Sequence, residues 1–185
     1  DLARALAGLF VMGGRSGSGL RESVQPSGPG DASGALPEFN FSKDPEAAAF
    51  VMSLPVPKTL VPFDAAFPVA ITAEEVLSLP VASALGPHRA RLARFARKQD
   101  LLRRVLGRRP GQAAGGFHPW DVVAAAALAA PEVFGAGRSV LVRVDAAGRT
   151  FLAEAGEGDP HAVYLPGPLD VALFRGAFLS YLSRC

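Results

Sequence analysis

Two short clusters of polar and aromatic residues carry the side chains that could do chemistry in this sequence. The first is Glu38-Phe39-Asn40, in which a carboxylate and the only asparagine of the chain lie two residues apart. On an extended backbone both side chains point to the same side. A carboxylate accepts hydrogen bonds and a carboxamide both donates and accepts them, so the pair suits sugar hydroxyls. The alternative is turn and helix-capping chemistry in a loop.

The second cluster is His118-Pro119-Trp120-Asp121, directly before an alanine-rich segment. Asp121 could be the N-cap of a helix over that segment, or an oxygen ligand of a hard cation such as Ca²⁺. Trp120, the only tryptophan, could be a core or rim aromatic, or it could stack on a flat ring. His118 could act as an acid or base, or it could be solvated or hydrogen-bonded to the backbone.

Composition excludes several other kinds of protein. The 185 residues suffice for one domain, and the hydrophobic content of 49% excludes a wholly disordered chain. A single cysteine, Cys185, excludes an internal disulfide framework and a thiolate zinc site. The longest apolar runs stay short of the ~20 residues that a membrane-spanning helix needs, so we expect no membrane partner. A net charge of +2 is too small to predict a nucleic-acid partner.

The elements that must position the first cluster alternate between strand and helix signals. Residues 9–12 form an apolar run typical of a parallel strand covered on both faces, and Gly13-Gly14 end it. Residues 13–37 are predicted to be a flexible loop without a phosphate-binding pattern. A helix is expected from Asp44-Pro45, because Asp suits the N-cap and Pro the first helical position. The next strand is predicted at 59–63.

The elements around the second cluster continue this alternation. Thr72 and Glu75 have the spacing of a capping box. Residues 88–109 predict a basic helix, interpreted as a solvated face with an apolar stripe; an anionic or nucleic-acid surface is the alternative. The rest of the pattern predicts a connector at 107–116 and a helical segment at 121–134 that stops near Pro131. Strands follow at 139–144 and 150–155, as a hairpin or as neighbours, and an amphipathic helix closes the chain. This order favours an α/β layered fold.

Four blocks of the sequence together resemble the inosine–uridine nucleoside hydrolase family. They are LFVMGG, PEFNFSKDPEAAAFVM, TLVPFDAAFPVAITAEE and WDVVAAAALAAPEVF, and their order and approximate spacing match over residues 1–178. The resemblance implies an α/β fold with a Rossmann-like layered sheet flanked by helices. It also implies hydrolysis of the N-glycosidic bond of ribonucleosides to ribose and free base, with a bound Ca²⁺.

The resemblance assigns roles to individual residues. Glu38 and Asn40 would hydrogen-bond the ribose, and Met12 would lie at the ribose pocket. Asp121 would be a Ca²⁺ ligand. Trp120 stands where many members have a histidine, which is similar to the purine-preferring branch, in which a tryptophan stacks on the base. It further implies a purine ribonucleoside as partner and a homo-oligomer. We separately expect a cytoplasmic location.

One departure from the family pattern limits what this chain is expected to do. The family's D-x-D-x-x-x-D-D block, which supplies most Ca²⁺ ligands and the general base, has no counterpart here, so that base is expected upstream of Asp1. Residues 1–185 therefore resemble a partial hydrolase domain, without a catalytic residue of its own and inactive when isolated. A non-catalytic nucleoside-binding or interaction module is the alternative, and a nucleic-acid-binding basic helix is a third hypothesis.

These assignments share one geometric expectation. Glu38, Asn40, Trp120 and Asp121 should gather round a single hollow sized for a pentose and its base.

Overall fold

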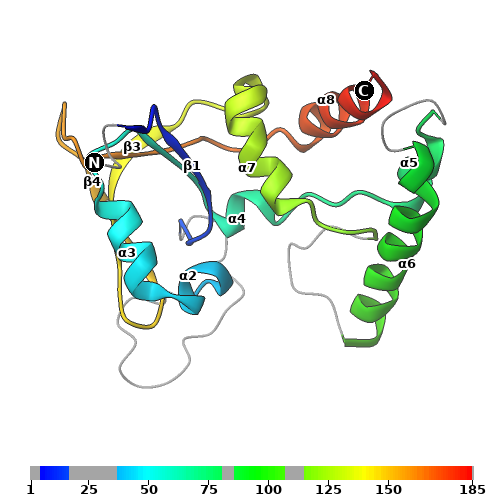
Figure 1. The fold of residues 1–185 in the computed structure, drawn as a ribbon, viewed down its shortest axis with the longest axis horizontal. Coiled ribbons are helices and arrows are strands. Elements are labelled where there is room, and N and C mark those ends of the chain that lie inside the picture. Colours follow the sequence, from blue (N-terminus) through cyan, green and yellow to red (C-terminus); the bar gives the residue numbers. More distant parts are fainter. Residues whose placement is uncertain (1–4, 17–36, 81–85, 107–114, 185) are drawn as a thin grey trace. The chain divides into compact units, whose positions relative to one another are not determined.

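The computed structural model describes residues 5–16, 37–80, 86–106 and 115–184, which form two compact units (Figure 1). Unit 1 comprises residues 1–66 and 123–169, and unit 2 comprises residues 67–122 and 170–185. The predicted loop at 13–37 lies outside the described residues except for its two ends, as does most of the connector at 107–116.

Unit 1 is built on a five-stranded mixed sheet. Its strands are β1 (Leu9–Met12), β2 (Lys58–Val61), β3 (Arg138–Val144), β4 (Thr150–Glu154) and β5 (Val163–Leu165), in the spatial order β1-β2-β5-β3-β4. The pairs β1–β2 and β2–β5 are parallel, whereas β3 is antiparallel to both β5 and β4. The described helices of this unit are α2 (Phe39–Lys43), α3 (Pro45–Ser53), α4 (Phe63–Ala66), the 3₁₀ turn η2 (Pro131–Val133) and most of α7 (Trp120–Ala129).

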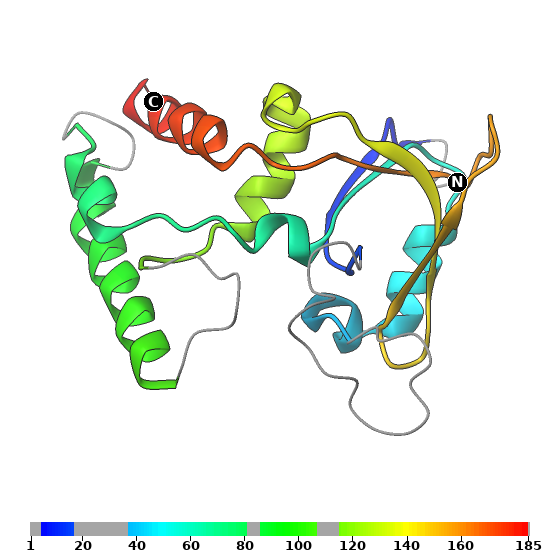
Figure 2. The ribbon, with the colours of Figure 1, turned by 180° about the vertical axis from the view of Figure 1, so that it is seen from behind.

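The core of unit 1 lies between the sheet and α3, which lies beside the sheet in Figures 1 and 2. Asp44 begins α3 as predicted: its carboxylate accepts from the N–H of Ala47 at 2.9 Å, and Pro45 fills the first position. The buried core residues are Phe41, Met52, Leu60, Val140, Val144, Val163 and Leu165. The α/β sheet flanked by helices is thus confirmed.

One charged side chain is buried at the start of β2. The Lys58 ammonium donates to the carbonyl oxygen of Val56 at 3.0 Å and to that of Leu54, just after α3. Burial lowers the pKa of Lys58, and the charge of Asp159 opposes that shift. The amine therefore ties the end of α3 to the sheet through backbone carbonyls.

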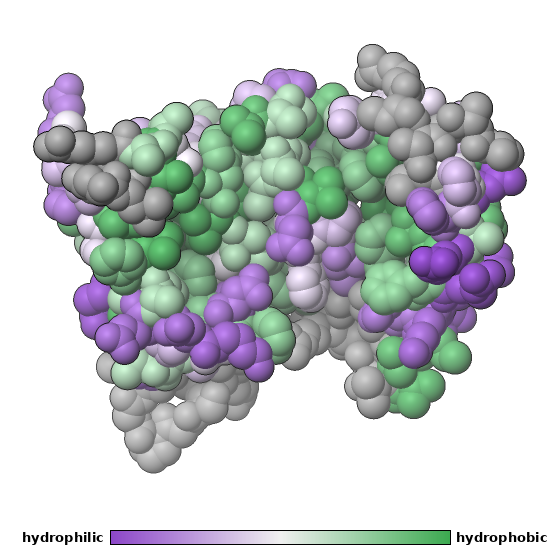
Figure 3. Space-filling view, viewed as in Figure 1, coloured by the Kyte–Doolittle hydropathy of each residue, from purple (hydrophilic) through white to green (hydrophobic). Residues whose placement is uncertain are grey.

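Unit 2 is helical. It contains α5 (Ala73–Ser78), the 3₁₀ turn η1 (Gly86–His88), α6 (Arg89–Leu106), α8 (Val171–Arg184) and the first residues of α7. Its core joins α5, α6 and α8 through Ile71, Ala73, Val76, Ala93, Ala96 and the half-buried Leu92, Phe117 and Phe178. Hydrophilic side chains gather over α6 in Figure 3, in agreement with the predicted solvated face.

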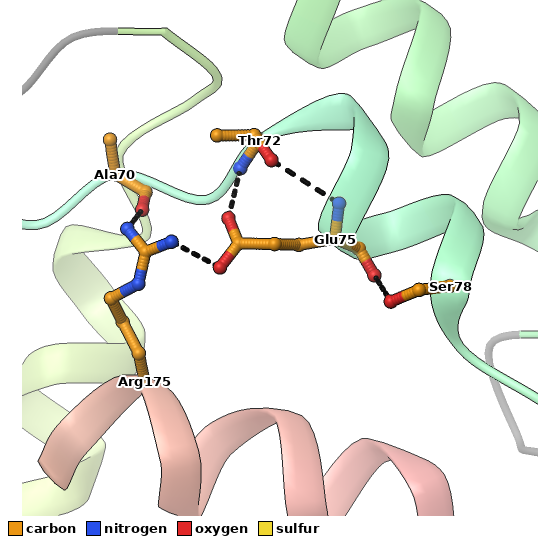
Figure 4. Close-up of polar contacts among 5 residues, drawn as sticks. All are labelled: Ala70, Thr72, Glu75, Ser78 and Arg175. Carbon is orange, nitrogen blue, oxygen red and sulfur yellow. Dashed lines mark hydrogen bonds and ion pairs between the residues drawn. The ribbon is translucent and has the colours of Figure 1, made fainter. Parts of the chain in front are cut away.

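A polar network holds α5 and α8 together in unit 2 (Figure 4). The predicted capping box is confirmed: Thr72 Oγ1 accepts from the N–H of Glu75 at 3.2 Å, and Glu75 Oε2 accepts from the N–H of Thr72 at 2.8 Å. The other oxygen of Glu75 forms an ion pair with Arg175 of α8, which also donates to the carbonyl of Ala70 at 2.7 Å. One carboxylate thus serves both a cap and an ion pair.

Helix α7 starts one residue earlier than predicted and ends, as predicted, near Pro131. It begins at Trp120, so Asp121 lies within the first turn and the expectation that it is the N-cap is wrong. It ends at Ala129, and η2 follows at Pro131 because proline cannot continue the helix. Among the residues that the structure describes, no helix is both long and apolar enough to cross a membrane.

Candidate functional site

One group of candidate site residues lies where β1 and β2 end, in unit 1. Carboxyl ends of parallel strands are where α/β sheets usually bind ligands. The N–H of Gly13 donates to Val61 at 3.3 Å, and the N–H of Phe63 donates to Gly14 at 3.0 Å. Both glycines are required here: a Cβ on Gly13 would lie 2.5 Å from the Phe41 ring, and Gly14 has φ +65°. The MGG sequence therefore lets the chain turn tightly against α2.

Glu38 is the buried centre of this region, with only 2% of its surface exposed. Its Oε2 accepts three backbone N–H groups, from Gly14 at 3.1 Å, Asn40 at 2.9 Å and Phe41 at 3.1 Å. The carboxylate thus caps α2 and holds the MGG turn, which confirms the capping alternative. Within the described part of the chain, no group donates to its other oxygen, Oε1. A single carboxylate can therefore organise the backbone with one oxygen and bind a ligand with the other.

Asn40 is exposed and lies in the first turn of α2. Its Nδ2 donates to the carbonyl oxygen of Met12 at 3.2 Å and lies 3.2 Å from the Met12 sulfur. An extended backbone through Glu38-Phe39-Asn40, the condition under which both side chains point to one side, is not met, because α2 begins at Phe39. The Glu38 cap nevertheless brings Met12, Glu38 and Asn40 to one place.

Two further residues, which the sequence did not indicate, contact this region from the β3–β4 hairpin. Gly148, at φ +77° in the turn, accepts from the N–H of Glu38 at 3.4 Å, and a Cβ there would lie 2.5 Å from Ser42 of α2. Thr150 Oγ1 accepts from the N–H of Arg15 at 3.1 Å. The glycine of the Asp-Ala-Ala-Gly-Arg turn was the available signal, but its contact with α2 is long-range and invisible in the sequence.

A separate group of candidate residues lies in unit 2, in the segment before α7 and at the start of that helix. Phe117 and Ile71 form an isolated antiparallel bridge with two backbone hydrogen bonds of 2.9 Å. Gly116 permits this approach: it has φ +71°, and a Cβ would lie 1.9 Å from the Ile71 carbonyl oxygen. The segment that leads to Trp120 is therefore fixed against residues 69–71.

The rings of Phe67, His118 and Trp120 lie nearly parallel in unit 2. The ring centroids of His118 and Trp120 are 5.6 Å apart with an interplanar angle of 13°, and those of Phe67 and His118 are 6.3 Å apart with an angle of 10°. The Nδ1 atom of His118 is hydrogen-bonded to the carbonyl oxygen of Val69. The interpretation of His118 as a histidine bonded to the backbone is thus confirmed.

The residues at the head of α7 are the partly exposed Trp120 and the exposed Asp121. A carboxylate suits Ca²⁺, but this ion takes six to eight oxygen ligands. In the described ranges of the chain, no three His, Cys, Asp or Glu residues are grouped as a metal site. Asp121 could supply one ligand, so the described residues alone do not make up a calcium site.

A comparison of this sequence with known protein families shows to which family the chain belongs. The family described as inosine-uridine preferring nucleoside hydrolase matches residues 1–175. The chain belongs to this family. Comparison with curated proteins found no match.

Solved structures of nucleoside hydrolases share the fold of this chain. A purine-preferring ribonucleoside hydrolase from Gardnerella vaginalis is 22% identical with a TM-score of 0.63, over 78% of this chain and 45% of that one. A plant nucleoside hydrolase, the PpNRh1 enzyme, is 16% identical with a TM-score of 0.62, over 79% and 47%. An inosine-uridine preferring nucleoside hydrolase from Bacillus anthracis is 18% identical with a TM-score of 0.53, over 100% and 56%. This member of the nucleoside hydrolase family thus spans about half the length of these structures.

Proposed function

We propose that this chain binds a purine ribonucleoside and forms part of an enzyme that hydrolyses the N-glycosidic bond to ribose and free base. The observation that carries the proposal is the meeting of Met12, Glu38 and Asn40 at the carboxyl ends of β1 and β2. Membership of the nucleoside hydrolase family supports the same reaction.

Ribose recognition is assigned to Glu38 and Asn40. Three backbone N–H groups fix the carboxylate of Glu38 through Oε2, which leaves Oε1 to accept a hydrogen bond from a ribose hydroxyl. The exposed carboxamide of Asn40 can donate to a second hydroxyl, next to Met12. Glycosidic cleavage passes through a ribosyl transition state of oxocarbenium character, which nearby negative charge stabilises. A buried carboxylate beside the ribose would supply that charge.

Base recognition is assigned to Trp120. An indole offers a flat apolar surface on which a base can stack, and the two fused rings of a purine overlap it more than a pyrimidine does. The similar structure from Gardnerella vaginalis, which is titled purine-preferring, supports this choice of base.

A calcium ion is proposed as the cofactor of the complete site, with Asp121 as one ligand. Ca²⁺ in such a site would orient water and sugar hydroxyls. Because one carboxylate cannot satisfy the ion, its other ligands would come from outside the described residues. Because the 185 residues also lack the D-x-D-x-x-x-D-D block of the family, we expect this chain to bind nucleoside without hydrolysing it. A cytoplasmic location and homo-oligomerisation stay predictions.

Fluorescence of the single tryptophan gives a direct binding test on the 185-residue chain. Quenching of Trp120 is titrated with inosine, uridine, ribose and hypoxanthine. If ribose and base bind to one site, inosine should bind at least about 10-fold more tightly than ribose or hypoxanthine alone, because the second contact adds to the first. Absence of inosine binding, or equal affinity for inosine and its two parts, would contradict the proposal.

A variant pair tests the ribose contact. Asn40→Ala should weaken inosine and ribose binding by about 5- to 10-fold, the value of one lost hydrogen bond. Ser42→Ala, which removes another exposed polar side chain of α2, is the matched control and should change neither affinity. Release of hypoxanthine from inosine by the unmodified chain with Ca²⁺ would refute the expected inactivity and also exclude the alternative of a non-catalytic binding module.

A further inference from the structure

The parallel rings of Phe67, His118 and Trp120 form a feature of unit 2 that ribose binding, metal binding and hydrolysis do not use. Phe67 is buried, with 5% of its surface exposed, whereas His118 and Trp120 are partly exposed. The planes of the two ring pairs are nearly parallel, with interplanar angles of 10° and 13°. Successive parallel rings thus connect the core to the indole at the head of α7.

The middle ring is fixed in orientation by a hydrogen bond. A carbonyl oxygen can only accept, so Nδ1 of His118 carries the proton that is donated to Val69. The Phe117–Ile71 bridge fixes the adjoining backbone, and Pro119, which is buried, follows directly. The imidazole is therefore held through its side chain and through the backbone on either side.

We propose that Phe67 and His118 act as positioning residues that set the plane of the Trp120 indole and thereby favour purines over pyrimidines. The inference rests on the proposed function to the extent that Trp120 is the surface on which the base stacks. A base that stacks on Trp120 would depend on the plane in which these rings hold the indole. Tilting of the indole would cost a purine more contact than a pyrimidine, because the purine covers more of the ring.

Substitutions at His118 separate the effect of its aromatic ring from the effect of its hydrogen bond to Val69. His118→Ala removes both the ring and the hydrogen bond, whereas His118→Phe keeps an aromatic ring without the Nδ1 donor. His118→Asn keeps a polar donor without the ring. Phe67→Leu removes only the first ring of the series. His88→Ala, at an exposed histidine of unit 2, is the matched control.

The first measurement needs no ligand. Near-ultraviolet circular dichroism of the single tryptophan reports how rigidly its ring is held. The Trp120 signal should fall in His118→Ala and His118→Asn, fall less in Phe67→Leu, and largely return in His118→Phe. An unchanged signal in folded His118→Ala, as judged by far-ultraviolet circular dichroism, would overturn the proposal. If His118→Ala does not fold, the contrast between His118→Phe and Phe67→Leu decides in the same way.

The second measurement is the ratio of affinities for inosine and uridine. Loss of one aromatic contact should weaken inosine binding by about 2- to 10-fold in His118→Ala, with a smaller change for uridine. Equal losses for the two nucleosides would show that His118 has only a general structural role. If the unmodified chain binds neither nucleoside, the proposed function fails, whereas the dichroism series still tests the positioning of Trp120.

Discussion

The carboxylate of Glu38 accepts three backbone N–H groups through one oxygen, so its first task is local structure. Removing it would leave buried N–H donors of Gly14 and Phe41 without an acceptor. Glu38→Ala should therefore lower the free energy of unfolding by about 2–3 kcal/mol, more than the loss of an ordinary N-cap. Urea denaturation followed by far-ultraviolet circular dichroism measures this.

Asp44→Ala is the matched control at the neighbouring helix. Asp44 also caps a helix, but it is exposed and accepts from one N–H group, of Ala47. We expect its loss to cost about 1 kcal/mol. If Glu38→Ala were no more destabilising than Asp44→Ala, Glu38 would not be the residue that holds the MGG turn to α2.

At the scale of elements, the turn of the β3–β4 hairpin packs against α2. A Cβ on Gly148 would lie 2.5 Å from the Ser42 backbone, so Gly148→Ala must displace either the hairpin turn or α2. Gly158 is a matched control, because it has φ +75°, close to the +77° of Gly148, and nothing lies within 4 Å of its Cβ position. Both substitutions carry the same strain of alanine at positive φ, roughly 1 kcal/mol.

The difference between these two variants isolates the packing of the turn against α2. The free energy of unfolding of Gly148→Ala should be about 1–3 kcal/mol lower than that of Gly158→Ala, which is the usual cost of overpacking. Because α2 carries Asn40, Gly148→Ala should also weaken inosine binding, whereas Gly158→Ala should leave it unchanged. Equal stability and equal inosine affinity of the two variants would rule out a role of the hairpin in positioning Asn40.

At the scale of the whole molecule, local signals in the sequence predicted most elements and few of the contacts between them. The Asp44-Pro45 start of α3 and the Thr72–Glu75 capping box were predictable, because each depends on residues within three positions. The short helix α2 was not, because the acceptor that begins it, Glu38, also binds Gly14 across 24 residues. The division into two units was equally hidden, since each is assembled from two separate stretches of chain.

In the candidate site too, local sequence signals indicated the residues but not the contacts that hold them. Glu38, Asn40, Trp120 and Asp121 could be singled out by residue type and by resemblance. The neighbours that hold them, such as Gly148 and the Phe67–His118 rings, come from distant positions and carry no local motif. That the four residues surround one hollow stays a prediction, which the comparison of inosine with ribose and hypoxanthine addresses.

Helix α8 completes unit 2, and Arg175 links this helix to Ala70 and to Glu75 of α5 through polar contacts. Its guanidinium donates to the Ala70 carbonyl and pairs with Glu75, whose second oxygen belongs to the capping box (Figure 4). Arg175→Met keeps the apolar stem but removes both contacts, so the backbone N–H groups of α5 and α8 should exchange faster. Because the pair is partly exposed, we expect a loss of about 1–2 kcal/mol.

Hydrogen exchange can assign this loss to one unit. Protection should fall in residues 72–78 and 171–184 and stay unchanged in β3 and β4 of unit 1, because Arg175 has its contacts within unit 2. Arg175→Lys should recover only part of the protection, since a single ammonium cannot reproduce the two directed donors of a guanidinium. Arg91→Met, at an exposed arginine of α6, controls for loss of charge alone. Equal protection in Arg175→Met and Arg91→Met would mean that apolar packing of Phe174 and Phe178 suffices to hold α8 in place.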